Sequence, residues 1–178
     1  MPCSCRAGTV RFRRLDARDR AARLAHIDRL GAEARRARFL GGGPPQTLPQ
    51  PHLAVGAFVG PRLIALGELY ALPDRTAAEL ALSVEPRFQN RGIGRRLLER
   101  LLVLARNRGF REVRTLCAVD NDSVGALMRR AGARIVHEPP EARGYLPLLP
   151  PTPATVLFEA LDLGEFVRER SMLPAAPP

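Results

Sequence analysis

The pattern of apolar and polar positions, read with the Gly and Pro turn residues, predicts seven strands and four helices. Strands are predicted at residues 9–14, 53–59, 62–70, 79–84, 113–119, 133–137 and 155–161. Helices are predicted at residues 16–30, 33–40, 92–108 and 121–131. The order is strand, two helices, three strands, helix, strand, helix and two strands. It predicts a mixed α/β domain with a hairpin half and a βαβ half.

Two of the helices show an apolar stripe that should face the core. The stripe of the first helix consists of Ala21, Leu24, Ala25, Ile27 and Leu30, and that of the long helix of Leu97, Leu98, Leu101, Leu102 and Ala105. Gly109 and Gly132 are placed to end two helices, and Gly60-Pro61 joins two strands as a hairpin. The Gly- and Pro-rich residues 41–51 and 138–154 are expected to be loops.

The length of 178 residues fits one domain, which we expect at 9–166 between a loose leader at 1–8 and a disordered tail at 167–178. No apolar run is long enough to cross a membrane, and the first residues lack the apolar stretch of a signal peptide. The expected location is therefore cytoplasmic. The three cysteines and three histidines show no spacing typical of a zinc site, so no metal is expected.

The net charge is +10, and all 28 basic residues are Arg. A GC-rich coding bias explains this composition, and an attraction to polyanions or to a phosphate-bearing cofactor is the alternative. The Arg residues are spread along the chain and are not interleaved with aromatic residues, as a stacking surface for nucleic acid would require. Nucleic acid is therefore the least favoured partner.

The turn before the long helix carries the clearest chemistry. Gln89, Gly92 and Gly94 lie between a strand and a helix start, where unpaired backbone N–H groups and the helix dipole attract a pyrophosphate. Arg91 and Arg95 add positive charge. Taken alone, the two glycines fit an ordinary strand-to-helix turn equally well. The segment lacks the Gly-Lys-Ser/Thr of a P-loop and the third glycine of the dinucleotide fingerprint.

Gln89-x-x-Gly92-x-Gly94, preceded by Leu82-Ser83-Val84-x-Pro86, resembles the acetyl-CoA motif of the GNAT (Gcn5-related N-acetyltransferase) superfamily. The resemblance covers residues 76–137 and continues through Gly109-Phe110, Asn121-Asp122-Ser123 and the segment 127–133. It implies a mostly antiparallel sheet of six to seven strands, splayed at the cofactor site and flanked by about four helices. Segments 78–84 and 33–41 are similar to the bacterial Pat-type protein lysine acetyltransferases.

The resemblance implies an N-acetyltransferase that uses acetyl-CoA as co-substrate. It places the pantetheine arm along one strand and the pyrophosphate on the glycine turn. The implied cofactor-binding residues are Leu82, Ser83, Val84, Gln89, Asn90, Arg91, Gly92, Ile93, Gly94, Arg95 and Asn121. A helix cap is the alternative role for Asn121. Because the chain contains no Lys, it cannot acetylate its own lysine side chains.

Transfer to an amine requires a base, since an alkylammonium group with a pKa of about 10.4 is not nucleophilic. Glu79 is the candidate base, because it lies in an otherwise apolar strand where partial desolvation would raise its pKa. The alternatives are an Arg-paired carboxylate at Glu79, and Glu68 as the base. Many GNAT members carry an acidic Tyr on the last helix, where this chain has Met128.

The acceptor is an amine of a small molecule or a protein. By analogy with the family, its pocket would come from residues 24–52 and 138–154, the second of which carries Glu138, Glu141 and Tyr145. A catalytically silent acetyl-CoA-binding sensor or regulatory module is the alternative function. A homodimer would pair through the last strands by the same analogy, and the oligomeric state stays open.

Overall fold

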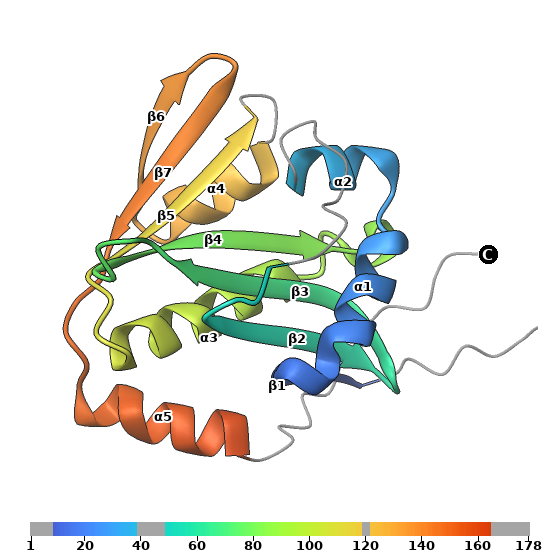
Figure 1. The fold of residues 1–178 in the computed structure, drawn as a ribbon, viewed down its shortest axis with the longest axis horizontal. Coiled ribbons are helices and arrows are strands. Elements are labelled where there is room, and N and C mark those ends of the chain that lie inside the picture. The colour runs from blue at the N-terminus through green and yellow to red at the C-terminus, as the bar shows by residue number, and fades with distance from the viewer. Residues whose placement is uncertain (1–8, 39–48, 119–121, 165–178) are drawn as a thin grey trace, which may run out of the picture.

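One mixed sheet organises the chain in the computed structural model, which describes residues 9–38, 49–118 and 122–164 (Figure 1). Within these ranges its strand order is β1-β2-β3-β4-β5-β7-β6. The strands are β1 (Val10–Arg14), β2 (Leu53–Val59), β3 (Arg62–Ala71), β4 (Ala77–Val84), β5 (Glu112–Ala118), β6 (Arg134–Glu138) and β7 (Glu141–Pro147). The helices are α1 (Arg20–Asp28), α2 (Ala32–Arg38), α3 (Ile93–Asn107), α4 (Asp122–Arg130) and α5 (Pro153–Gly164).

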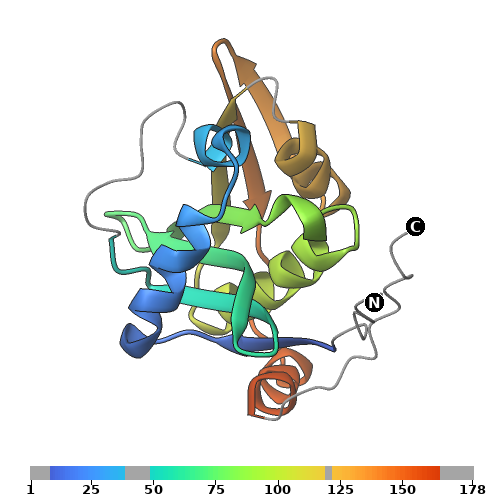
Figure 2. The same ribbon diagram turned by 90° about the vertical axis from the view of Figure 1, so that its right-hand side faces the viewer.

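The sheet is antiparallel except where β4 pairs with β5. Helices cover both faces of its amino-terminal half, and Figure 2 shows α1 and α3 on opposite sides of it. Leu97, Leu98 and Leu101 of α3 belong to the main core, whereas Ile27 and Leu30 pack with Leu66 in a smaller core on the other face. Strand β3 is consequently buried over most of its length.

The carboxyl-terminal half consists of β5, β7 and β6, with α4 packed against β6 and β7. It joins the other half through the parallel pairing of β4 with β5 and through the chain that leaves α3. Gly109 and Gly132 have positive φ angles of 80° and 95° and end α3 and α4 as predicted. The Gly60-Pro61 hairpin between β2 and β3 is likewise confirmed.

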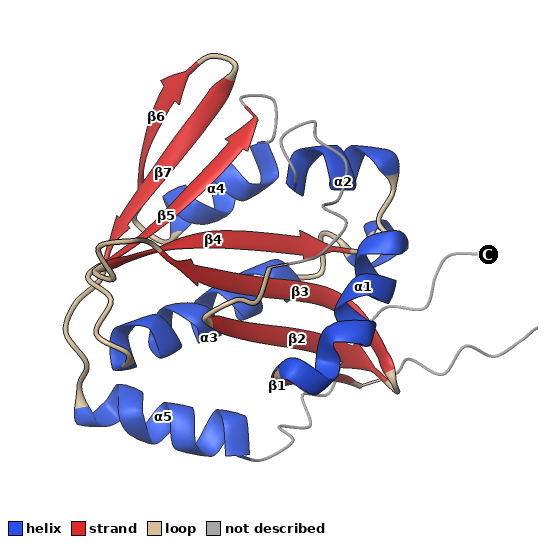
Figure 3. Cartoon of the chain, in the orientation of Figure 1, coloured by secondary structure: helices blue, strands red, loops and turns tan. Residues whose placement is uncertain are grey.

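The strand predicted at 155–161 is wrong, because these residues belong to helix α5 (Figure 3). Thr152 and Pro153 begin the helix: the Thr155 backbone N–H donates to Thr152 Oγ1 at 3.3 Å, and proline suits the first helical turn. The short apolar run Val156-Leu157-Phe158 fits a strand or a helix, so this cap was the deciding signal.

The prediction of a loop throughout 138–154 is also wrong, because β7 lies inside that stretch. The buried residues of β7 are Ala142, Gly144 and Leu146, alternating with more exposed ones. Flanking prolines and a glycine in the strand concealed this alternation. The described residues therefore form seven strands, the number predicted, with β7 in place of the expected last strand.

The buried side of α1 differs from the predicted stripe. The residues that face the sheet are Arg23, His26, Ile27 and Leu30, at the spacing i, i+3, i+4 and i+7. Ala21 and Ala25, which we predicted to be buried, are exposed. The apolar pattern failed here because two of the buried positions are polar and have partners on the sheet.

No helix within the described residues is both long and apolar enough to cross a membrane. The leader expected at 1–8 and the tail expected at 167–178 lie outside the described residues, as does Asn121.

Candidate active site

Strands β4 and β5 separate after a short stretch of parallel pairing. Their register runs from Ala77↔Glu112 to Leu80↔Thr115. Beyond that point no pair between these two strands occurs in the described part of either strand, although β4 continues to Val84 and β5 to Ala118. Figure 1 shows the two strands diverging like the arms of a V. The residues 81–84 thus keep a backbone edge that can bond an extended ligand.

The open end of this V lies beside the turn that leads into α3. Gly92 caps α3 in the left-handed conformation, with φ 74° and ψ 1°, and Asn90 also has a positive φ of 57°. A Cβ placed on Gly92 would have no atom within 4 Å, so the space in front of this backbone is open. The amides of Ile93, Gly94 and Arg95 precede the first helical hydrogen bond, from Arg96 N–H to the Gly92 carbonyl, and lie at the positive end of the helix.

The side chains of the turn either brace it or surround it with positive charge. Gln89 Nε2 donates to the Val84 carbonyl at 3.1 Å, which ties the turn to the end of β4. Arg91 and Arg95 are exposed, and Arg95 also pairs with Glu99 at 3.3 Å on the helix surface. The turn therefore combines open backbone amides with exposed guanidinium groups, an arrangement that favours anion binding.

A buried network holds β4 from the side of α1. His26 Nε2 lies 3.0 Å from Ser83 Oγ, and both residues are buried. His26 Nδ1 lies 3.8 Å from Glu85 Oε1. Desolvation outweighs the attraction of Glu85 and lowers the pKa of His26 to about 4, so the ring is neutral at pH 7.

Glu85, which follows β4, is the charged centre of the same network. It accepts hydrogen bonds from Arg29 Nε at 2.8 Å and from Arg62 Nη2 at 2.7 Å. Burial raises the pKa of this carboxyl group, but the bonds from Arg62 and Arg29 outweigh burial, and the pKa lies below its usual range. Sequence reasoning missed both His26 and Glu85. The 3.6-residue period that places His26 beside Ile27 and Leu30 was the available signal.

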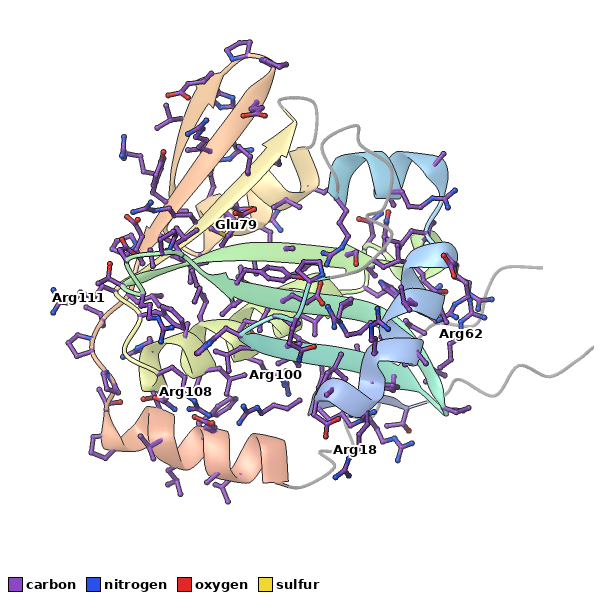
Figure 4. The ribbon with its side chains drawn as sticks, viewed as in Figure 1. Arg18, Arg62, Glu79, Arg100, Arg108 and Arg111 are labelled. Atoms are coloured by element: carbon purple, nitrogen blue, oxygen red, sulfur yellow. The ribbon has the colours of Figure 1, made fainter. Side chains whose placement is uncertain are left out.

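Glu79 lies on β4 near the vertex of the V, as Figure 4 shows. Its Cα partners are Tyr70 on β3 and Arg114 on β5, so these three side chains share one face of the sheet. The partial burial that we expected for Glu79 is wrong, because its side chain is exposed. The carboxylate can consequently be reached by a molecule that enters along this face.

Glu68, the alternative base, is enclosed. Its side chain has 0% exposure, and its two oxygens accept from Arg23 Nε at 2.7 Å and from Arg38 Nη2. Arg23 also donates to the Pro49 carbonyl at 3.0 Å. The carboxylate thus joins α1 and α2 to β3. Because the side chain is enclosed and both of its oxygens bond guanidinium groups, an acceptor amine cannot reach it.

Tyr70 stands between these two carboxylates in the sheet. Desolvation, with a smaller contribution from the charge of Glu68, raises the pKa of Tyr70 to about 12. Met128 is fully buried in the core and carries no proton to donate. The expected late acceptor residues are also occupied: Glu138 and Glu141 lie 3.4 Å and 3.8 Å from Arg143, and Arg134 lies over the Tyr145 ring at 5.1 Å.

The structure brings most of the predicted site residues together. Leu82, Ser83 and Val84 line the free part of β4, and the residues from Gln89 to Arg95 form the adjoining turn and helix start. The Ser83 side chain is buried against His26, which leaves the backbone groups of Ser83, the ones expected to bond the pantetheine arm, for a ligand in the V. Asn121 lies outside the described residues.

Three solved structures illustrate the fold that this chain shares. The GNAT domain of S. lividans PAT aligns with a TM-score of 0.69 and 22% identity, over 79% of this chain and 92% of that one. An acetyltransferase of the GNAT family from Streptococcus pneumoniae aligns with a TM-score of 0.68 and 17% identity, over 79% and 99%. The ribosomal-protein-S18-alanine N-acetyltransferase from Escherichia coli aligns with a TM-score of 0.59 and 18% identity, over 81% and 97%.

No curated protein sequence matches the chain. The family model for the acetyltransferase (GNAT) family matches residues 23–133, a segment that begins within α1 and includes the splayed strands and the glycine turn. With this match over more than half of its length, the chain belongs to the GNAT family of acetyltransferases and is an N-acetyltransferase.

Proposed function

We propose that the chain transfers an acetyl group from acetyl-CoA to a primary amine of a small molecule or a protein. The observation that carries this proposal is the gap between β4 and β5, which opens directly onto the left-handed turn at Gly92. An extended arm and a pyrophosphate need these two features at this spacing: a free strand edge and a helix start with open backbone.

The residues present fit acetyl-CoA. Backbone groups of residues 82–84 would bond the pantetheine amides, and backbone amides from Gln89 to Arg95 would bind the pyrophosphate. The prediction that Asn121 contacts the arm stays a prediction. When bound, the co-substrate supplies an acetyl group activated as a thioester. The protein supplies the strand edge that positions the co-substrate, and a base.

Glu79 is the proposed base. An amine acceptor with a pKa of about 10.4 arrives as an ammonium ion and must lose a proton before its nitrogen lone pair can attack the thioester carbonyl. Glu79 would take that proton, directly or through one water molecule, because it is exposed at the vertex of the V. Water supplies the proton for the departing thiol, since Met128 occupies the position of the family's acidic Tyr.

The acceptor would approach on the sheet face that carries Tyr70, Glu79 and Arg114, beneath α2. The structural relatives leave both acceptor classes open. One of them is named for acetylating an alanine of a ribosomal protein, and another is the GNAT domain of a PAT protein. A screen of small amines and of lysine and amino-terminal peptides would decide between the classes.

Calorimetric titration with acetyl-CoA tests the cofactor site. Gly92→Glu should abolish binding, because a side chain and a negative charge would fill the open space in front of the amides. Gly109→Glu is the matched control: Gly109 has a similar φ of 80° and equally open space, at the far end of α3. The two variants should lose similar stability, but only Gly92→Glu should lose binding.

Absence of binding by the unmodified chain at millimolar cofactor, or equal binding by both variants, would refute the proposed site. Binding without turnover of any amine in the screen would point instead to the silent binding module.

A further inference from the structure

Helix α5 is built with its polar side turned inward. Within its described side chains only Thr155 and Glu159 are partly covered, and none is buried. Glu159 accepts from Arg108 Nη2 at 2.7 Å and from Asn107 Nδ2 at 2.8 Å, and Thr155 Oγ1 donates to Asn107 Oδ1 at 2.7 Å. These bonds attach α5 to the end of α3, and Figure 1 shows the two helices next to each other. The apolar side is left facing outward.

The apolar face of α5 consists of Val156, Leu157, Phe158 and Leu161, with Leu149 just before the helix. Their exposed fractions are 55%, 59%, 45%, 60% and 71%. A helix of 12 residues is only marginally stable by itself in water, so such helices depend on packing an apolar face. Here that packing surface is unused within the described chain. Exposed apolar patches of this kind mark interaction sites.

We propose that the apolar face of α5 is a dimer interface that binds the same face of a second copy of this chain. A shallow hollow lies on its amino-terminal half, lined by Pro151, Thr152, Pro153, Val156, Leu157 and Ala160. Leu161 projects one turn beyond Leu157. A twofold axis near Leu157, crossing α5 at right angles, would place Leu161 of each copy over the hollow of the other.

Charge also favours contact through this face. Each copy carries a net charge of +10, so two copies repel wherever their Arg residues meet. The described outward side chains of α5 are uncharged, and Glu159 is turned inward onto Arg108. The helix is bonded to Asn107 and Arg108 at the carboxyl end of α3, whereas the proposed cofactor site lies at Gly92, before the amino end of α3.

Sedimentation equilibrium of the full chain over a range of concentrations tests the proposal. The unmodified chain should associate to twice its mass of 19.5 kDa. Leu157→Glu combined with Leu161→Glu should raise the dimer dissociation constant about 100-fold or more, because a buried unpaired charge strongly opposes association. His137→Glu, an exposed position on edge strand β6, is the matched control and should leave the dimer intact.

Cross-linking adds a readout of geometry. With Cys3 and Cys5 replaced by Ser, Leu157→Cys, at the proposed axis, should form an intermolecular disulfide on mild oxidation, whereas Ala71→Cys, exposed at the end of β3, should not. A chain that is monomeric at every concentration, or a dimer that persists in the double α5 variant, would overturn the proposal. A dimer that is lost in His137→Glu and kept in the α5 variant would place the interface on β6 and contradict the proposal. If the chain is a monomer that the α5 substitutions destabilise, another segment of the same chain packs on this face, and the dimer proposal is wrong.

Discussion

Removing the carboxylate of Glu68 while keeping its shape should destabilise the protein strongly. Glu68→Gln leaves Arg23 and Arg38 facing a neutral amide at a site where the exposed fractions are 0% for Glu68, 2% for Arg23 and 3% for the Arg38 side chain. Breaking a buried ion pair costs about 3–5 kcal/mol, since the remaining charge stays buried without its partner. For a chain of this length, that corresponds to a fall in Tm of roughly 6–20 °C.

Urea unfolding followed by circular dichroism measures this loss as a change in the denaturation midpoint at constant slope. Replacing Arg23, Arg38 and Glu68 together with Met, Met and Leu should recover most of the lost stability, because the desolvation of three charged groups disappears with them. Surface pair Arg95–Glu99 is the control, and Glu99→Gln should change stability by less than about 0.5 kcal/mol.

The same variant separates structure from catalysis. Well below its Tm, Glu68→Gln should keep turnover within a few-fold of the unmodified enzyme, since we assign Glu68 to holding α1 and α2 on β3. Unchanged stability together with a large loss of kcat would refute this reasoning and make Glu68 the base.

Two further predictions concern the site itself. Glu79→Gln should lower kcat about 100-fold or more while leaving acetyl-CoA affinity unchanged, as titration and steady-state kinetics would show; equal kcat would remove Glu79 as the base. The lowered pKa of His26 means that the unfolded chain binds a proton between pH 6.5 and about 4 that the folded chain does not. The free energy of unfolding should therefore decrease by roughly 3 kcal/mol as the pH is lowered from 6.5 to about 4. Urea unfolding of His26→Gln should show a flatter pH dependence there, and an identical dependence would contradict the assignment.

The order of the elements could be predicted from the sequence where one physical signal dominated. The glycine turn, the long α3 stripe and the Gly60-Pro61 hairpin each combine a period with a turn residue, and all three are present. The strand prediction for residues 155–161 is wrong because their apolar run fits both the helical and the strand period, and the helix is marked only by the Thr152 cap before it. Strand β7 was not predicted because two of its buried positions are Ala142 and Gly144, whose small side chains do not stand out as an apolar alternation.

The site was predictable as a backbone motif and less so as a set of side chains. Gly92 is conspicuous in sequence because few other residues tolerate its conformation. The pairing of His26 with Ser83 joins residues 57 positions apart, and only the folded chain brings them together. The same holds for Glu85, whose Arg partners come from α1 and the start of β3. Composition alone, with 28 Arg residues, could not indicate which of them pair with it.

The short pairing of β4 with β5 also bears on how the molecule opens. Within the described residues β4 pairs with β5 over four positions, Ala77↔Glu112 to Leu80↔Thr115, whereas β4 pairs with β3 over seven. The carboxyl-terminal half is therefore suited to fluctuate as a cooperative unit of its own, with amide hydrogen exchange faster in β5 than in β3. A ligand bonded along both arms of the V would bridge the two halves and slow that exchange, so that saturation with substrate also stabilises the fold.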